Sequence, residues 1–338
     1  MSAQKIILDC DPGIDDALAL VFAHGHPDLE LCGITTVAGN VGLDLTTANA
    51  LRVGELLGLV EAGWAGEGGG DQVPVVAGCA GPLLGGPLRA MLDARLTHGD
   101  DGLAGARLPP PAAKPRDGHA VDFLIDTIAA APGEINLVAT GPLTNIAVAV
   151  RREPALVTQV RDFVIMGGSA TRGNVTAAAE FNIAADPEAA AIVFGAGWQV
   201  TMVGLDVTLR ARARPEVLDR MRGLGRLADD LLLPCLARYR TDPLPVPGQP
   251  PATGPAVHDV CAVARVARPG LIRCTGARVE VETCGRLTAG MTVTDFRAPP
   301  PDRNTLVATE IDVDGFWDVV LGAFTRAARS ARGQHAAP

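Results

Sequence analysis

Short apolar runs alternate with amphipathic stretches along most of this sequence. The first run, KIILD at residues 5–9, is bounded by polar and turn residues, as is typical of a buried parallel strand. Pro12-Gly13 follows, and residues 14–25 then have apolar side chains at helical spacing. The same alternation predicts further strands at 29–39, 73–78, 135–141, 162–168 and 199–206, and further helices at 45–59, 120–133, 142–150 and from about 186.

This order of elements predicts an α/β fold. Strands that follow one another through helices favour a single open, mostly parallel sheet flanked by helices on both faces. Near the C-terminus, residues 279–296 predict a small strand pair and residues 315–331 a closing amphipathic helix. Because no internal repeat and no linker is recognisable, we expect residues 1–338 to form one domain.

Three segments depart from the pattern. Residues 61–72 are Gly-rich and residues 241–255 contain six prolines, so we expect both to be flexible loops. The proline-rich segment should also be extended, because proline favours open, irregular backbone. We expect a disordered tail at residues 332–338.

Composition is that of a soluble globular protein. Hydrophobic residues make up 48% of the 338 residues, and the net charge of −9 argues against a nucleic-acid partner, which would need a basic patch. The seven cysteines contain no CxxC pair and indicate neither a zinc ribbon nor a disulfide framework. No segment resembles a signal peptide, and the longest apolar stretch, near 189–205, is interrupted by glycines and a glutamine. We therefore expect a cytoplasmic protein with no membrane partner.

Four aspartates lie within DCDPGIDDAL at residues 9–18: Asp9, Asp11, Asp15 and Asp16. Two carboxylates about 4 Å apart repel by roughly 4 kcal/mol near a protein surface, whereas a helix dipole stabilises each by only about 0.3–1 kcal/mol. Capping and solvation can account for one or two of these charges. A hard cation such as Ca²⁺, which prefers oxygen ligands, can account for all four. The DxD motif of haloacid-dehalogenase-type phosphatases is a competing interpretation, although Pro12-Gly13 replaces the Gly-Thr that usually follows its second aspartate.

Other polar and glycine residues are placed in a similar way to Asp11. They lie at the carboxyl ends of the predicted strands and are Gly39-Asn40, Thr140-Gly141 and Gly167-Gly168. Ligands of parallel α/β sheets bind beyond the carboxyl ends of the strands, so these residues should meet at one rim.

The motifs together resemble those of the inosine–uridine-preferring nucleoside hydrolases. ILDCDPGIDDALAL is similar to the N-terminal signature of that family, and the likeness continues through most of the chain in GITTVAGN (33–40), HGDDGL (98–103), ATGPLTNIA (139–147), VIMGGSATRGNVTAAAEFNIAADPEAA (164–190), VGLDVT (203–208), AVHDVCAV (256–263) and GRLTAGMTVTDFR (285–297). The resemblance implies a Rossmann-like nucleoside hydrolase fold and a homodimer or homotetramer. It also implies Ca²⁺-dependent hydrolysis of the N-glycosidic bond of purine or pyrimidine ribonucleosides, or both, to free base and ribose.

The resemblance also implies roles for the matching residues. The Ca²⁺ ligands would be Asp11, Asp16 and Asp259 through their carboxylates and Thr140 through its backbone carbonyl, with Asp11 acting in addition as general base for direct attack by water. The residues that match the family's ribose-binding positions are Asp15, Asn40, Asn174, Glu180 and Asn182. Each of these, taken alone, is better explained as an ordinary turn or loop residue, although amides and carboxylates suit hydroxyl recognition. The phrase AAAEFNIAADPEAA favours binding instead, because it places Glu180 and Asn182 just before a helix start at Asp186-Pro187.

Three histidines lie in family-like segments. His258, next to Asp259, is either a helix-start residue or the general acid for the departing base, and its position in AVHD favours the acid. We assign His119 to structure and His98 to a flexible loop near the pocket. Related enzymes often carry several tyrosines before this motif, whereas Tyr239 is the single tyrosine here, so the nucleobase preference stays open.

Two alternatives remain on sequence grounds. One is a Mg²⁺-dependent phosphatase of the haloacid-dehalogenase type, and the other is a non-catalytic nucleoside-binding protein of the same fold. The role of Asp9 is open.

Overall fold

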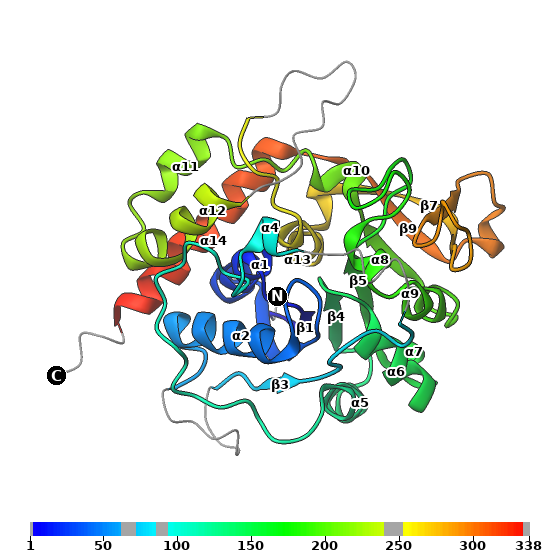
Figure 1. Cartoon of the computed structure of the whole chain (residues 1–338), viewed down its shortest axis with the longest axis horizontal. Helices are drawn as coiled ribbons and strands as arrows, with labels where there is room; N and C mark the ends of the chain where they lie inside the picture. The colour runs from blue at the N-terminus through cyan, green and yellow to red at the C-terminus, as the bar shows by residue number, and fades with distance from the viewer. Residues whose placement is uncertain (1–2, 62–71, 86–93, 240–252, 334–338) are drawn as a thin grey trace.

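A nine-stranded sheet runs through the part of the chain that the structure describes. Its central strands lie near the middle of the molecule in Figure 1. The computed structural model describes residues 3–61, 72–85, 94–239 and 253–333. The strand order is β3-β2-β1-β4-β5-β6-β9-β7-β8. The strands are β1 (Gln4–Cys10), β2 (Leu29–Thr36), β3 (Val75–Ala77), β4 (Ile135–Ala139), β5 (Asp162–Met166), β6 (Val200–Val203), β7 (Ile272–Val281), β8 (Thr292–Asp295) and β9 (Thr305–Ile311).

Pairing within the sheet confirms the predicted mostly parallel α/β fold. The strands from β3 to β9 in this order pair in parallel, β7 is antiparallel to β9, and β8 is antiparallel to β7. The strand pair predicted at 279–296 exists as β7 and β8, but it continues the main sheet instead of standing apart from it. The link is β9, which the sequence pattern did not predict.

Helices cover both faces of the sheet. On one face lie α1 (Ile14–Gly25), α2 (Leu43–Leu57), α13 (Asp259–Ala267) and α14 (Val313–Gly333), and on the other α5 (Ala120–Ala130), α6 (Thr144–Arg152) and α9 (Pro187–Phe194). Side chains of β1 pack alternately against the two helix layers, because successive residues of a strand point to opposite faces. Ile6 and Leu8 belong to the core cluster on the α1 side of the sheet, and Ile7 belongs to the one on the α5 side. The apolar character of the whole strand follows from this double burial.

Shorter helices complete the fold. They are α4 (Arg95–His98), α7 (Leu156–Gln159), α8 (Phe181–Ala185), α10 (Leu205–Thr208), α11 (Pro215–Met221), the π-helix η1 (Leu227–Leu232), α12 (Leu233–Arg238) and the 3-10 turns η2 (Pro269–Leu271) and η3 (Pro300–Asp302). Most of the segment between β6 and residue 239 joins the core cluster that contains α14, and the sequence analysis predicted none of its helices. Within the described residues, no helix has both the length and the apolar composition needed to cross a membrane.

Element ends differ from the predictions mainly where the chain leaves the sheet. The strand predicted at 29–39 ends at Thr36 and the one at 135–141 ends at Ala139, because the next residues turn into the rim. The helix predicted at 142–150 begins at Thr144. The loops expected at 61–72 and 241–255, and the tail expected at 332–338, lie largely outside the described residues.

Candidate active site

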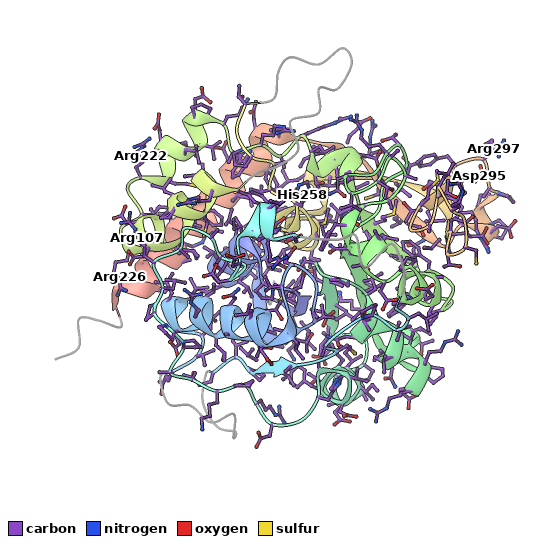
Figure 2. All side chains as sticks on the ribbon, in the orientation of Figure 1. Arg107, Arg222, Arg226, His258, Asp295 and Arg297 are labelled. Atoms are coloured by element: carbon purple, nitrogen blue, oxygen red, sulfur yellow. The ribbon has the colours of Figure 1, made fainter. Side chains whose placement is uncertain are left out.

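Residues from distant parts of the sequence meet at the carboxyl ends of the central strands. Asp11 follows β1, Asn40 lies just beyond β2, and Thr140 follows β4. These three strands are adjacent in the sheet, so the predicted rim is present. Two helix starts also reach it, because Asp15 and Asp16 open α1 and Asp259 opens α13. Figure 2 shows His258 next to α13, near the middle of the molecule.

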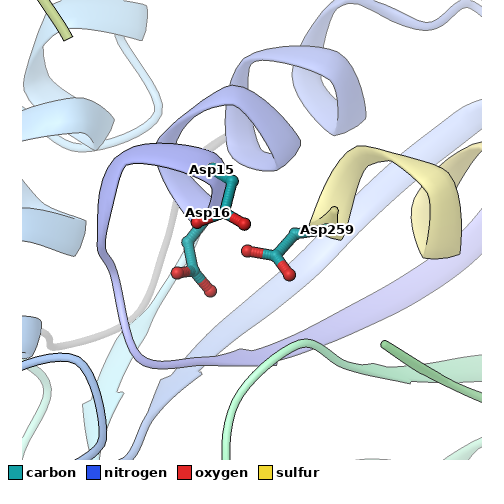
Figure 3. Close-up of side chains that lie close together, drawn as sticks. All are labelled: Asp15, Asp16 and Asp259. Carbon is teal, nitrogen blue, oxygen red and sulfur yellow. The ribbon is translucent and has the colours of Figure 1, made fainter. Parts of the chain in front are cut away.

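Three carboxylates gather at this rim. Asp15, Asp16 and Asp259 each place one oxygen so that the three oxygens lie within 4.8 Å of one another, and all three residues are buried. Figure 3 shows the side chains turned toward one another from the first turns of the two helices. Among the described residues, no Lys or Arg side chain forms an ion pair with these carboxylates, so the group is suited to a metal ion.

Asp11 lies beside this trio and not within it. Its Oδ2 accepts a hydrogen bond from the Asn40 backbone N–H at 2.7 Å, while its buried Oδ1 has no partner within the described residues. Both oxygens of Asp16 are oriented by its neighbours: Oδ2 accepts from the Gly13 N–H at 3.0 Å and from Asn40 Nδ2 at 3.2 Å, and Oδ1 from Thr140 Oγ1 at 2.9 Å. Asp11 Oδ1, which has no partner among the described residues, therefore adds a fourth carboxylate that can bind a ligand beside the trio.

Burial and mutual repulsion make these charges costly. Burial, followed by the charge of Asp16, raises the pKa of Asp11 well above its usual range. Burial and the neighbouring Asp15 raise the pKa of Asp16 to about 7, and the same two causes raise the pKa of Asp259. A bound cation removes both penalties, because it supplies the opposite charge that these carboxylates lack. The donor set, all oxygen, fits a hard divalent cation.

Thr140 and Asn182 connect two strand ends at the rim. Asn182 Nδ2 donates to the Thr140 carbonyl at 2.7 Å and to the Met166 carbonyl at 3.0 Å. The Thr140 N–H donates to the Asp9 carbonyl at 2.8 Å. The Thr140 carbonyl is thus fixed in place, and because it accepts no other hydrogen bond among the described residues, its second lone pair can take a further ligand.

Glu180 and Asn174 occupy different environments. Glu180 caps α8 and accepts hydrogen bonds from the N–H groups of Gly168, Asn182 and Ile183 at 2.9–3.2 Å. It is almost fully buried, and burial raises its pKa to about 7 in spite of these bonds. Asn174 is exposed on the preceding loop and accepts from the Phe181 N–H at 3.0 Å. Of the five predicted ribose-binding residues, Asn174 alone lies outside the buried part of the rim.

The three histidines have distinct surroundings. His258 Nδ1 lies 2.8 Å from Thr208 Oγ1, and burial lowers the pKa of the ring. His98 lies in α4 and not in a loop as expected: it is buried, and its Nδ1 accepts from the Ile14 N–H at 3.1 Å. His119 has the structural role assigned to it, since its Nδ1 accepts from the Val121 N–H at the start of α5.

Sequence reasoning assigned no role to two groups near the site. Tyr239 is buried, hydrogen-bonds to Asp15 and packs its ring 5.4 Å from the ring of His98. Asp9 Oδ1 accepts from Thr35 Oγ1 at 2.6 Å and from Asn145 Nδ2 at 2.8 Å, which makes Asp9 a supporting residue behind the rim. Burial raises its pKa to about 6. Asn145, the partner of Asp9, lies within the motif ATGPLTNIA. This motif was the one feature of the sequence that could have indicated the contact with Asp9.

Comparison with known proteins extends over nearly the whole chain. A family model described as inosine-uridine preferring nucleoside hydrolase matches residues 6–318. An inosine-uridine preferring nucleoside hydrolase of Leishmania major is 45% identical, and the match covers 96% of this chain and 98% of the relative. A non-specific ribonucleoside hydrolase of Salmonella enteritidis is 42% identical, and the match covers 96% of this chain and 99% of the relative. The structure of a purine-preferring ribonucleoside hydrolase from Gardnerella vaginalis matches with a TM-score of 0.83 at 33% identity, over 96% of this chain and 99% of that one.

Fold, site and relatives together define an enzyme of the nucleoside N-ribosylhydrolase class. The match is continuous from β1 into α14, so it is not confined to a shared motif. The chain belongs to the inosine-uridine preferring nucleoside hydrolase family. This confirms the resemblance drawn from the motifs and argues against the phosphatase alternative.

Proposed function

We propose that the protein hydrolyses the N-glycosidic bond of purine or pyrimidine ribonucleosides, or both, to free base and ribose, in a Ca²⁺-dependent reaction with direct attack by water. The observation that carries the proposal is the buried acidic group at the rim. Three carboxylate oxygens lie within 4.8 Å of one another, and Asp11 Oδ1 beside them has no partner among the described residues. A cation that binds there would make the group stable, and oxygen donors favour Ca²⁺.

The residues that would hold the ion are Asp11, Asp16 and Asp259 through their carboxylates and Thr140 through its carbonyl. Support for this set comes from the free Oδ1 of Asp11 and from the fixed Thr140 carbonyl, which retains a lone pair. When bound, Ca²⁺ lowers the pKa of water and gives the ribose hydroxyls a fixed point of attachment.

Asp15, Asn40, Asn174, Glu180 and Asn182 are proposed to bind the ribose. Glu180 and Asn182 favour this role through their position, because α8 carries both to the rim beside Thr140. Asp15 has an oxygen in the acidic trio and also bonds to Tyr239. Asn174 would act from the exposed loop above them.

The proposed chemistry uses one residue on each side of the scissile bond. The Asp11 carboxylate accepts a proton from water as the water oxygen bonds to C1′ of the ribose and the C1′–N bond breaks. The anionic surroundings favour the positive charge that develops on the ribose ring. His258 donates a proton to the nitrogen of the departing base. A p-nitrophenyl leaving group needs no such proton, so p-nitrophenyl riboside separates the two roles.

A reducing-sugar assay tests the proposal. Inosine, uridine, cytidine, adenosine and guanosine are compared with and without a calcium chelator, in wild type, Asp16→Asn and the control Asp44→Asn. Asp44 lies in the first turn of α2, as Asp16 does in α1, but is exposed and far from the acidic group in sequence. We expect ribose release that chelation and Asp16→Asn abolish and that Asp44→Asn leaves unchanged, with calorimetric Ca²⁺ binding lost in parallel.

Other outcomes would contradict particular parts of the proposal. Ribose release that resists the chelator would refute calcium dependence. Calcium binding without ribose release would support a non-catalytic binding protein, and phosphate release from a phosphomonoester alone would support the phosphatase.

We further propose that the chain forms one domain, assembles as a homodimer or homotetramer and resides in the cytoplasm. Light scattering coupled to size-exclusion chromatography measures the oligomeric state. The three relatives differ in the substrate preference in their names, so the five-nucleoside comparison is also what assigns the nucleobase preference here.

A further inference from the structure

Thr208 contacts the ring of His258. Thr208 Oγ1 and His258 Nδ1 are 2.8 Å apart, and Thr208 is fully buried while His258 keeps 9% of its surface exposed. Because a hydroxyl both donates and accepts, it can pair with Nδ1 whether or not that nitrogen carries a proton. In either case Nδ1 is occupied, and Nε2 is the ring nitrogen left for a substrate.

The helix that carries Thr208 is anchored to the rim. The Leu205 N–H donates to the Gly168 carbonyl at 3.0 Å, and Asp206 accepts from the Ala170 N–H at 2.8 Å and from Thr171 Oγ1 at 2.7 Å. A side chain at Gly204 would collide with the Gly168 carbonyl, so the two backbones are in direct contact. α10 is therefore fixed relative to the end of β5.

The backbone just before His258 is anchored to the residues that follow α10. The Val257 N–H donates to the Ala211 carbonyl at 2.9 Å, and the Ala213 N–H donates to the Pro255 carbonyl at 2.8 Å. With both backbones held, the remaining freedom of His258 is rotation about its side-chain bonds. The bond to Thr208 restricts that rotation.

We propose that Thr208 is a positioning residue for the reaction: it holds His258 Nδ1 and so presents Nε2 to the departing base. The inference rests on the proposed role of His258 as proton donor. A donor must lie within about 2.6–3.2 Å of its acceptor, and a displacement of about 1 Å can cost roughly 100-fold in rate. Loss of the hydroxyl should therefore slow the reactions that need the proton and spare those that do not.

The test compares Thr208→Val, which keeps the shape and removes the hydroxyl, with Thr208→Ser, which keeps the hydroxyl. Thr201→Val is the matched control, because Thr201 is a buried threonine in β6 that plays no part in the site. Each variant is assayed on inosine, on uridine and on p-nitrophenyl riboside, and Thr208→Val is repeated in a His258→Ala background.

We expect Thr208→Val to lower kcat on the nucleosides by about 10- to 100-fold with KM changed less than about threefold. Turnover of p-nitrophenyl riboside should change less than about twofold, Thr208→Ser should restore nucleoside turnover, and Thr208→Val should add no loss to His258→Ala. Circular dichroism checks folding, and Thr208→Ala replaces Thr208→Val if the latter does not fold.

Equal losses on both substrate types, a further loss in the His258→Ala background, or no loss on nucleosides would each overturn the positioning role. Wild-type protein that releases no ribose would overturn the proposed function itself. The two failures are distinct, because the first set of outcomes requires an active wild type.

Discussion

Replacement of Asn145 by alanine is expected to destabilise the protein strongly, because this fully buried side chain makes three hydrogen bonds. Nδ2 donates to Asp9 Oδ1 at 2.8 Å and to the Thr36 carbonyl at 3.0 Å, and Oδ1 accepts from the Cys79 N–H at 2.8 Å. A bond to a charged group contributes about 1.5–3 kcal/mol and a neutral one about 1 kcal/mol. Asn145→Ala should therefore lower the free energy of unfolding by about 4 kcal/mol, a large share of the ~5–15 kcal/mol typical of a native protein.

Asn136→Ala is the matched control. Asn136 is equally buried, but its side chain donates one bond, from Nδ2 to the Lys5 carbonyl at 2.9 Å, and its Oδ1 has no partner in the described part of the chain. Both substitutions remove the same atoms, so the cavity contribution is similar and the difference reports the hydrogen bonds. We expect the lost hydrogen bond of Asn136→Ala to cost about 1 kcal/mol or less, in addition to the cavity contribution that both variants share.

Urea unfolding followed by tryptophan fluorescence measures both variants. Trp198 and Trp317 are buried, so their emission reports loss of the core. The expected result is a difference of at least about 2 kcal/mol between the two variants at unchanged m-value. If Asn145→Ala were no less stable than Asn136→Ala, the reasoning that Asn145 supports the strand ends through these bonds would be refuted.

Two further predictions follow from close packing and from protonation. Gly39→Ala should lower ribose release by roughly 100-fold, because the added methyl group would collide with Asp11 Oδ2. Gly42→Ala, whose added methyl group meets nothing within 4 Å, is the control. Equal activity of the two variants would contradict a role for close packing of Gly39 against Asp11. Burial, then the charge of Arg268, lowers the pKa of His26 from 6.5 to about 4, so the unfolded chain binds the proton first and stability should fall by at most about 3 kcal/mol as pH drops from 6.5 to 4. When the urea midpoint is plotted against pH, His26→Gln should flatten the curve between pH 6.5 and 4. An unchanged slope would rule out His26 as the source of this pH dependence.

The fold class was predictable because it rests on local patterns. Apolar runs that alternate with helical spacing are enough to specify strands buried on both faces between helices. The same argument failed for β9 and for the helices between β6 and residue 239. These elements depend on what they pack against: β9 joins β6 to β7, and the other segment buries its apolar side chains against the layer of α14.

The sequence by itself also determined which residues meet at the rim. The carboxyl ends of neighbouring parallel strands lie together, so Asp11, Asn40 and Thr140 were expected there before any geometry was known. The family motifs in the sequence added Glu180, Asn182 and His258 to the predicted site.

Only the tertiary structure decided how these side chains are partnered. It groups Asp15 with Asp16 and Asp259, leaves Asp11 Oδ1 without a partner among the described residues, and pairs His258 with Thr208. Hydrogen bonds and burial depend on distances between residues far apart in the chain, and no local pattern encodes those distances. The sequence therefore specifies the chemical groups of the site, whereas the packing of helices on the sheet assigns each group its partner.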